Sequence, residues 1–232
     1  MRERASGSAE NAADGAHLSW LHAGPYPMYA GKRPKVDYRR APYGIDYYST
    51  VPGLPKDKRS TLIFPSANRF ESGRAEQIGG LRQNILFRTP QDDIHTLNFF
   101  ITLYPLTDGS LVHHTDTPPE LPRGPWIATE RGVYPPGDEQ WWGVESIMQD
   151  RMVQEGQGLI LDRSTENLGG SDRGVVLFRQ MLKESIDAVQ NGQDPIGIVR
   201  DKTSNPVPDF GTHRHEVPAG AAERVGGRPC SA

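Results

Sequence analysis

Two histidines near the start of the chain, with an acid beside them, could form half of a metal site. Asp14, His17 and His22 lie within nine residues, in the stretch Asp14-Gly15-Ala16-His17-Leu18-Ser19-Trp20-Leu21-His22. Imidazole and carboxylate ligands together suit iron(II), and two histidines with one acid leave coordination positions open for dioxygen and substrate. Such a centre needs a third protein ligand, usually a carboxylate, from elsewhere in the fold. The stretch is therefore half of a candidate non-haem iron site.

The spacing of the two histidines restricts the backbone that carries them. On a straight α-helix a five-residue step turns by about 140°, so His17 and His22 would diverge unless the helix ends, tightens or bulges between them. Asp14 and His17 are three residues apart and share a helix face, so the Asp14 carboxylate can orient the imidazole by a hydrogen bond. By spacing alone, two histidines near a helix end are more often surface or capping residues than ligands.

The elements that must position these residues begin with a short helix. Residues 10–21 are alanine-rich and predict a helix that ends before Gly24-Pro25. The stretch 24–60, rich in proline, glycine and tyrosine, predicts a long surface excursion with one short strand over 43–51. A mostly antiparallel sheet is predicted from the β-branched and aromatic runs at 60–69, 83–89 and 96–106. Residues 110–140 are rich in proline and predict a long loop that could cover a pocket.

Two amphipathic helices are predicted after this loop. The first, over 141–155, carries Asp150, the candidate third ligand, but the apolar periodicity does not decide which way Asp150 points. The second, over 172–190, has one continuous apolar stripe: Val175, Phe178, Leu182, Ile186 and Val189. We therefore expect one domain over 10–200, preceded by a polar segment over 1–9 and followed by a disordered Pro/Gly-rich tail over 201–232.

Composition excludes several classes of partner. The 232 residues include 26 Lys plus Arg and 29 Asp plus Glu, and the net charge of −3 predicts neither nucleic-acid nor membrane binding. No apolar run approaches the roughly 20 residues needed to span a bilayer, and the first residues lack the apolar segment of a signal peptide. A cytoplasmic location is expected. The single cysteine, Cys230, excludes an internal disulfide framework and an all-cysteine metal cluster.

The order Asp-x-x-His-x-x-x-x-His at residues 14–22 is similar to the signature of the Rieske non-haem iron oxygenases, the aromatic ring-hydroxylating α subunits. Later segments resemble the phthalate dioxygenase branch of that family, in the same order: 88–96, 145–156, 162–172 and 192–195. The resemblance covers roughly residues 10–200, so it is far more specific than a match of two histidines.

This resemblance implies that His17, His22 and Asp150 bind a mononuclear iron(II) and that Asp14 connects the centre to the electron donor. It implies an α+β helix-grip fold (START/Bet v 1-like), a curved antiparallel sheet around a long C-terminal helix. Family members use O2 and electrons relayed from NAD(P)H by a separate reductase to hydroxylate or O-demethylate aromatic substrates, such as phthalate-like aryl acids and aryl ethers. They form homotrimers in which the Rieske [2Fe-2S] cluster of a neighbouring subunit donates the electrons.

A Rieske cluster needs two cysteines and two histidines, so this chain with one cysteine cannot hold it. We therefore expect a catalytic domain without the Rieske domain, with the cluster supplied by a missing domain or a partner. Two alternatives stay open: a non-catalytic helix-grip domain that binds a hydrophobic ligand, and a zinc hydrolase with the same three ligands.

Other charged residues are harder to assign. An aryl carboxylate would need a cationic partner such as Arg163, Arg173 or Arg179, and nothing in the sequence selects one. The remaining histidines are interpreted as turn, loop and tail residues: His95, His113, His114, His213 and His215.

Overall fold

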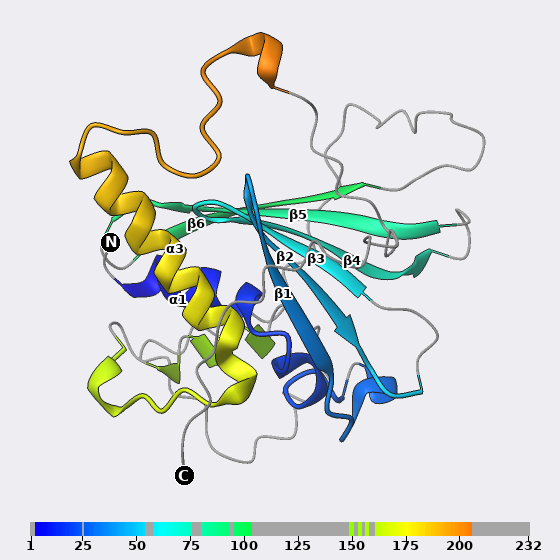
Figure 1. The fold of residues 1–232 in the computed structure, drawn as a ribbon. Coiled ribbons are helices and arrows are strands. Elements are labelled where there is room, and N and C mark those ends of the chain that lie inside the picture. Colours follow the sequence, from blue (N-terminus) through cyan, green and yellow to red (C-terminus); the bar gives the residue numbers. More distant parts are fainter. Residues whose placement is uncertain are drawn as a thin grey trace.

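The computed structural model describes residues 3–24, 26–53, 58–75, 80–92, 95–103, 149–150, 153–154, 156–157 and 161–205 (Figure 1). Within them lie the helices α1 (Glu3–Ala13) and α3 (Arg173–Gln190). The strands are β1 (Lys35–Ala41), β2 (Gly44–Thr50), β3 (Lys58–Ile63), β4 (Ala67–Ala75), β5 (Gly80–Pro90) and β6 (Thr96–Leu103).

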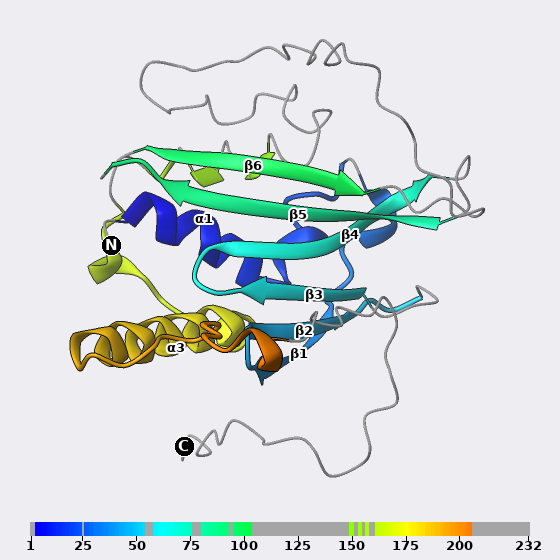
Figure 2. The same ribbon diagram turned by 90° about the horizontal axis from the view of Figure 1, so that it is seen from above.

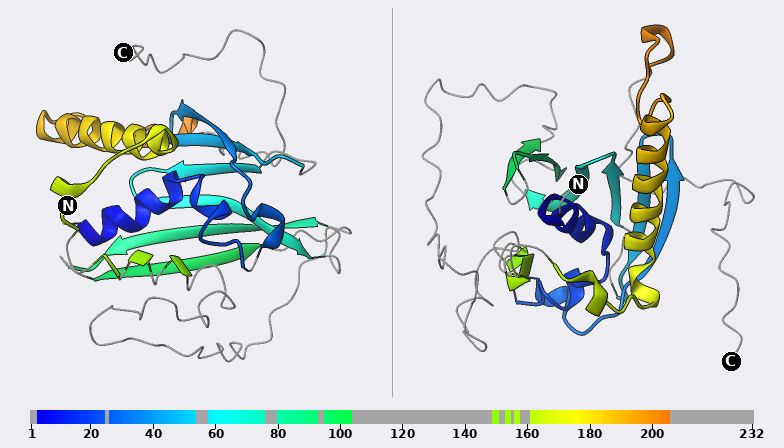
Figure 3. Two further views of the ribbon diagram at one scale, coloured as in Figure 1. Left: turned by 90° about the horizontal axis from the view of Figure 1, so that it is seen from below. Right: turned by 90° about the vertical axis from the view of Figure 1, so that its left-hand side faces the viewer.

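The six strands form one antiparallel sheet in sequence order, as Figure 2 shows. Side chains alternate between the two faces of a strand, so directly paired residues share a face. One face is therefore defined by a row of directly paired residues, one from each of the strands β2 to β6: Ile45, Leu62, Asn68, Leu86 and Phe100. The sheet curves around α1 on this side (Figure 3), and we call it the concave face. A curved antiparallel sheet with a long C-terminal helix confirms the predicted α+β helix-grip fold.

The core lies between the concave face and the two helices. On α1 the buried residues are small (Ala9, Ala12 and Ala13), which lets this helix approach the sheet closely. On α3 the ring of Phe178 lies 5.3 Å from that of Phe64, centroid to centroid. Burying a side chain of this size contributes about 1.5–3 kcal/mol. The rest of the cluster consists of Ile45, Leu62, Val175, Leu177 and Met181.

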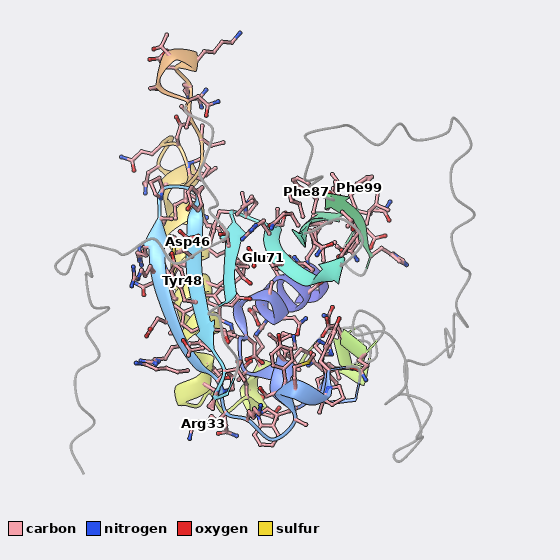
Figure 4. All side chains as sticks on the ribbon, turned by 90° about the vertical axis from the view of Figure 1, so that its right-hand side faces the viewer. Arg33, Asp46, Tyr48, Glu71, Phe87 and Phe99 are labelled. Carbon is pink, nitrogen blue, oxygen red and sulfur yellow. The ribbon has the colours of Figure 1, made fainter. Side chains whose placement is uncertain are left out.

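The opposite, outer face is different at β5 and β6. Phe87 and Phe99, a directly paired couple, are exposed there and point away from α1 (Figure 4). Leu97 and Ile101 are exposed on the same face, so apolar side chains of these two strands contact solvent on this side of the sheet.

An ion-pair cluster joins α1 to α3. Arg179 of α3 binds Glu10 of α1 at 2.8 Å and Glu166 at 2.6 Å, and Arg163 binds Glu10 at 3.1 Å. The hydrogen bonds that Arg179 donates to Glu166 and Glu10 raise the pKa of its guanidinium, and the bonds to Glu166 lower the pKa of that carboxyl group. Two of the three arginines considered for an aryl carboxylate are thus already paired with acids.

The predicted helix at 172–190 is confirmed by α3, although Ile186 and Val189 of its stripe are exposed. The helix predicted over 10–21 has the wrong bounds, because α1 begins at Glu3 and ends at Ala13.

Two predictions about strands are also wrong. The stretch 24–60 holds β1 as well as β2, and the run 60–69 divides into β3 and β4 around a turn. As an edge strand with half-exposed, largely polar side chains, β1 carries little hydrophobic signal.

Some predicted elements cannot be compared with the structure. The 110–140 loop, most of the 141–155 helix and the tail from residue 206 lie outside the described residues. Of the 141–155 helix, residues 149–150 and 153–154 are described and are helical. No described helix has the length and apolar character needed to cross a membrane.

Candidate metal centre

The end of α1 sets the position of the first histidine. Tyr38 of β1 donates a hydrogen bond to Ala13 O at 2.9 Å and accepts one from Gly15 N at 3.2 Å. The Asp14 carboxylate accepts a hydrogen bond from Ala16 N at 2.8 Å. The Ala13 carbonyl and the Gly15 and Ala16 amides therefore bind side chains instead of forming the hydrogen bonds of a further helical turn. For this reason α1 ends at Ala13.

Glycine is needed where α1, β1 and α3 meet. A Cβ atom at Gly174 of α3 would lie 2.2 Å from Tyr38 Cε1 and 2.3 Å from Ala13 O. A Cβ atom at Gly15 would lie 2.9 Å from Val36 Cγ2. Both distances are shorter than van der Waals contact, so the close approach that holds Tyr38 on the end of α1 depends on these two residues lacking side chains.

The two histidines converge after this stop. His17 begins a 3-10 helix (His17–Ser19), and a turn then carries the chain to His22. Their rings lie 5.1 Å apart, centroid to centroid, at an interplanar angle of 82°. Because α1 ends before His17, the two imidazoles can point toward each other, whereas on a continuous helix they would point in different directions.

Asp150, from a distant part of the chain, completes the group. Its Oδ1 atom lies 3.1 Å from His22 Nε2 and 3.7 Å from His17 Nε2. This oxygen is buried and has no hydrogen-bond partner among the described residues. A buried carboxylate oxygen without a partner is costly, and a cation between the three side chains would compensate for it.

Both imidazoles present Nε2 to this centre because Nδ1 is engaged. His17 Nδ1 lies 2.5 Å from Asp14 O, and His22 Nδ1 lies 2.8 Å from Gln149 Oε1. A carbonyl oxygen can only accept, so the hydrogen-bond network assigns the proton to Nδ1 and leaves the Nε2 lone pair for a metal. Gln149 is 1% exposed and immediately precedes Asp150, so one helical turn supplies both an acid and an orienting amide.

The residues fit a metal ion. The three ligand atoms lie within 4.8 Å of one another. Two donors that bind one ion at about 2.1 Å and at right angles are separated by about 3 Å, so the side chains must draw together by up to about 2 Å to bind it. Two imidazoles and one carboxylate on one side of an ion match the donor set of non-haem iron(II) sites with open positions.

Ionisable side chains of the concave face lie within electrostatic range of the acids of this group. Burial raises the pKa of Tyr47, which also lies within electrostatic range of Asp14, Arg88 and Asp150. Burial lowers the pKa of Arg88 to about 10, opposed by the negative charge of Asp150. Burial likewise raises the pKa of Tyr38. At neutral pH both phenols keep their protons and the guanidinium keeps its charge.

The structure brings together His17, His22 and Asp150, and it places Asp14 on the turn just before His17. One expectation is wrong: the backbone carbonyl of Asp14, not its carboxylate, contacts the His17 ring. His95 lies in a turn, where its backbone N–H binds the Asp92 carboxylate, as predicted. The histidines at 113, 114, 213 and 215 lie outside the described residues.

Sequence reasoning missed Gln149, Tyr38 and Arg88. The position of Gln149 next to Asp150 is a usable signal, since metal-bound histidines need an acceptor for their second nitrogen. Tyr38 acts across 23 residues of sequence, and no local pattern indicates that.

Comparison with known proteins supports the oxygenase resemblance. Residues 131–212 match the family described as LigXa C-terminal domain like. The chain is 27% identical over 229 residues to the 5,5'-dehydrodivanillate O-demethylase oxygenase subunit of Sphingobium sp. (strain NBRC 103272 / SYK-6). This alignment covers 93% of the chain and 50% of that relative, so the chain spans about half the relative's length. The two matches support the resemblance predicted from the sequence: the chain is similar to part of an oxygenase subunit, and its later residues are similar to a C-terminal domain family.

Proposed function

We propose that the chain is an oxygenase catalytic domain that hydroxylates or O-demethylates an aromatic substrate at an iron(II) ion held by His17, His22 and Asp150. One observation carries the proposal most directly. Two imidazole Nε2 atoms face one buried carboxylate oxygen that has no hydrogen-bond partner among the described residues. The match to an O-demethylase oxygenase subunit supports the reaction class.

Each part of the centre has a task in this proposal. The iron, when bound, would supply the activation of O2. Asp14 O and Gln149 Oε1 fix the tautomer and orientation of the two imidazoles, which keeps Nε2 available. Burial of His22, which is 2% exposed, excludes water from one side of the group. Asp150 contributes the negative charge that holds a divalent ion.

Electrons must reach this centre from outside the chain. In the proposal they come from NAD(P)H through a separate reductase and a Rieske [2Fe-2S] cluster carried by another domain or partner. Asp14, beside His17 at the end of α1, is the residue on which they would enter. A homotrimer would place the cluster of one subunit beside the iron of its neighbour.

The substrate class is proposed from the relative. That protein is named for the O-demethylation of 5,5'-dehydrodivanillate. We extend only the chemical class to this chain: an aromatic acid or an aryl ether.

A turnover assay tests the proposal against its alternatives. The iron(II)-loaded chain is combined with NADH, a reductase and a Rieske donor protein, and oxygen uptake is followed with a panel of methoxylated aryl acids. Substrate-dependent uptake with release of the demethylated or hydroxylated product is expected. An Asp150→Ala variant should give none, whereas Asp194→Ala, which changes an exposed acid paired with Arg200, should keep it.

Two results would contradict the proposal. Iron binding without oxygen uptake under every pairing would favour the non-catalytic ligand-binding domain. Stoichiometric zinc, rather than iron, in protein purified without added metal would favour the hydrolase.

A further inference from the structure

Arg88 of β5 is a buried cation without an acidic partner among the described residues. Only 4% of it is exposed. Its Nε donates to Ser8 Oγ of α1 at 2.9 Å, and its Nη1 donates to Asn68 Oδ1 of β4. Both acceptors are neutral. Burying a guanidinium without a counter-ion is costly, so such a residue is expected to meet an anion during function.

Other arginines of the fold show how unusual this is. Arg69, which is also 4% exposed, has Glu71 at 3.0 Å. Arg179 binds two carboxylates. Arg88 has no such contact among the described residues: burial lowers the pKa of its guanidinium, and the negative charge of Asp150 only partly offsets this.

Metal binding at the proposed centre would remove that support. Asp150 would then neutralise part of the charge of a divalent ion, and both the ion and Arg88 would act as positive charges on the same interior. An anionic group between them would lower the electrostatic energy of this interior. The loaded site therefore favours a negatively charged ligand.

The neighbours of Arg88 favour an aromatic ligand. On the concave face of β6, Asn98 pairs directly with Arg88, and Phe100 follows two residues later. Both are exposed. Phe100 packs edge-on against Phe70, with the ring centroids 6.0 Å apart. An exposed aromatic side chain thus lies beside a buried guanidinium. The ring of an aromatic ligand can pack edge-on or offset against Phe100, the arrangements that aromatic pairs prefer.

We propose that Arg88 binds the carboxylate of the substrate, whose ring packs against Phe100, and that this contact makes the chain select aromatic acids over neutral aryl ethers. A planar guanidinium can bind a carboxylate through two parallel hydrogen bonds. The proposal rests on the proposed function, and it assigns the specificity of that site to a residue outside the metal group.

Binding measurements test this assignment. The full chain is loaded anaerobically with iron(II) and titrated calorimetrically with 3-methoxybenzoate and with 3-methoxybenzyl alcohol, which keeps the ring and the ether but lacks the charge. The wild type should bind the acid about 10- to 100-fold more tightly, the range expected for hydrogen bonds to a charged group. Arg88→Gln should lose most of this preference while its affinity for the alcohol stays nearly constant. Arg40→Gln, which changes a β1 arginine already paired with Glu184, should keep the preference.

The outcomes separate this assignment from the proposed function. Iron stoichiometry is measured in the same samples, and a chain that binds no iron contradicts the proposed function. A loaded chain that binds acid and alcohol equally, binds neither, or keeps its preference in Arg88→Gln overturns the role of Arg88. If Arg88→Gln does not fold, Arg88→Lys decides: reduced acid preference with normal iron binding supports the role, and unchanged preference overturns it.

Discussion

Replacement of Gly174 by alanine should disturb the metal group from a distance. The new Cβ would lie 2.2 Å from Tyr38 Cε1 and 2.3 Å from Ala13 O, where ordinary contact is about 3.5 Å. The start of α3 must therefore move by about 1 Å from the end of α1. This movement strains or breaks the bond from Tyr38 to Ala13 O, on which the stop before His17 depends.

The size of the effect follows from three contributions. Overpacking costs about 1–3 kcal/mol, and the loss of one hydrogen bond costs about 1 kcal/mol. The better helix propensity of alanine returns up to about 1 kcal/mol. A net loss of about 1–3 kcal/mol in the free energy of unfolding corresponds to a fall in melting temperature of about 2–12 °C for a chain of this length. The affinity for iron(II) should fall as well.

Thermal unfolding followed by circular dichroism checks the stability, and competition with a chelator checks the affinity. Gly170→Ala is the matched control, since no atom lies within 4 Å of a Cβ built there. It should change the free energy of unfolding by no more than about 0.5 kcal/mol. Equal melting temperatures for Gly174→Ala and Gly170→Ala would refute the reasoning about the junction between α1 and α3.

Two further predictions concern the imidazole partner and the ion-pair cluster. Gln149→Leu leaves the buried His22 Nδ1 proton without its acceptor, so iron(II) affinity in a chelator competition should fall about 10- to 100-fold; unchanged affinity would show that Gln149 does not orient the ring. Arg179 lowers the pKa of Glu166 in the folded state below its ordinary 4.5, so the stabilisation is fully present above pH 4.5 and is lost as the pH falls through the folded-state pKa. In Glu166→Gln the free energy of unfolding, measured by urea unfolding at a series of pH values, should therefore decrease less below pH 4.5 than in the wild type. The same decrease in both proteins would contradict this.

The sequence predicts the fold where local patterns repeat. The stripe of α3 and the aromatic runs of the later strands identify their elements, because alternation and helical periodicity reflect one buried face. The pattern fails at β1, whose polar residues lie half-exposed at the sheet edge. It also fails at the end of α1, because that end is decided by the Tyr38 hydroxyl group, 25 residues from Ala13.

The candidate site is predicted in part for the same reason. The spacing of His17 and His22 requires a break in the helix, and the structure has one. The apolar pattern around Asp150 does not show which way its side chain points. That depends on a contact between Gln149 and His22, which are 127 residues apart in the sequence. Arg88 resembles any charged strand residue until its burial and its neutral partners are known.

An anaerobic titration of the full chain with iron(II) tests the central claim most directly. We expect one iron per chain in the wild type. In Asp150→Ala we expect binding at least 100-fold weaker, with the fold retained as judged by circular dichroism. The exposed-acid variant Asp194→Ala should bind as the wild type does. A wild-type chain that binds no stoichiometric iron(II), or an Asp150→Ala variant that binds it as tightly as the wild type, would contradict the assignment of His17, His22 and Asp150 as the iron ligands.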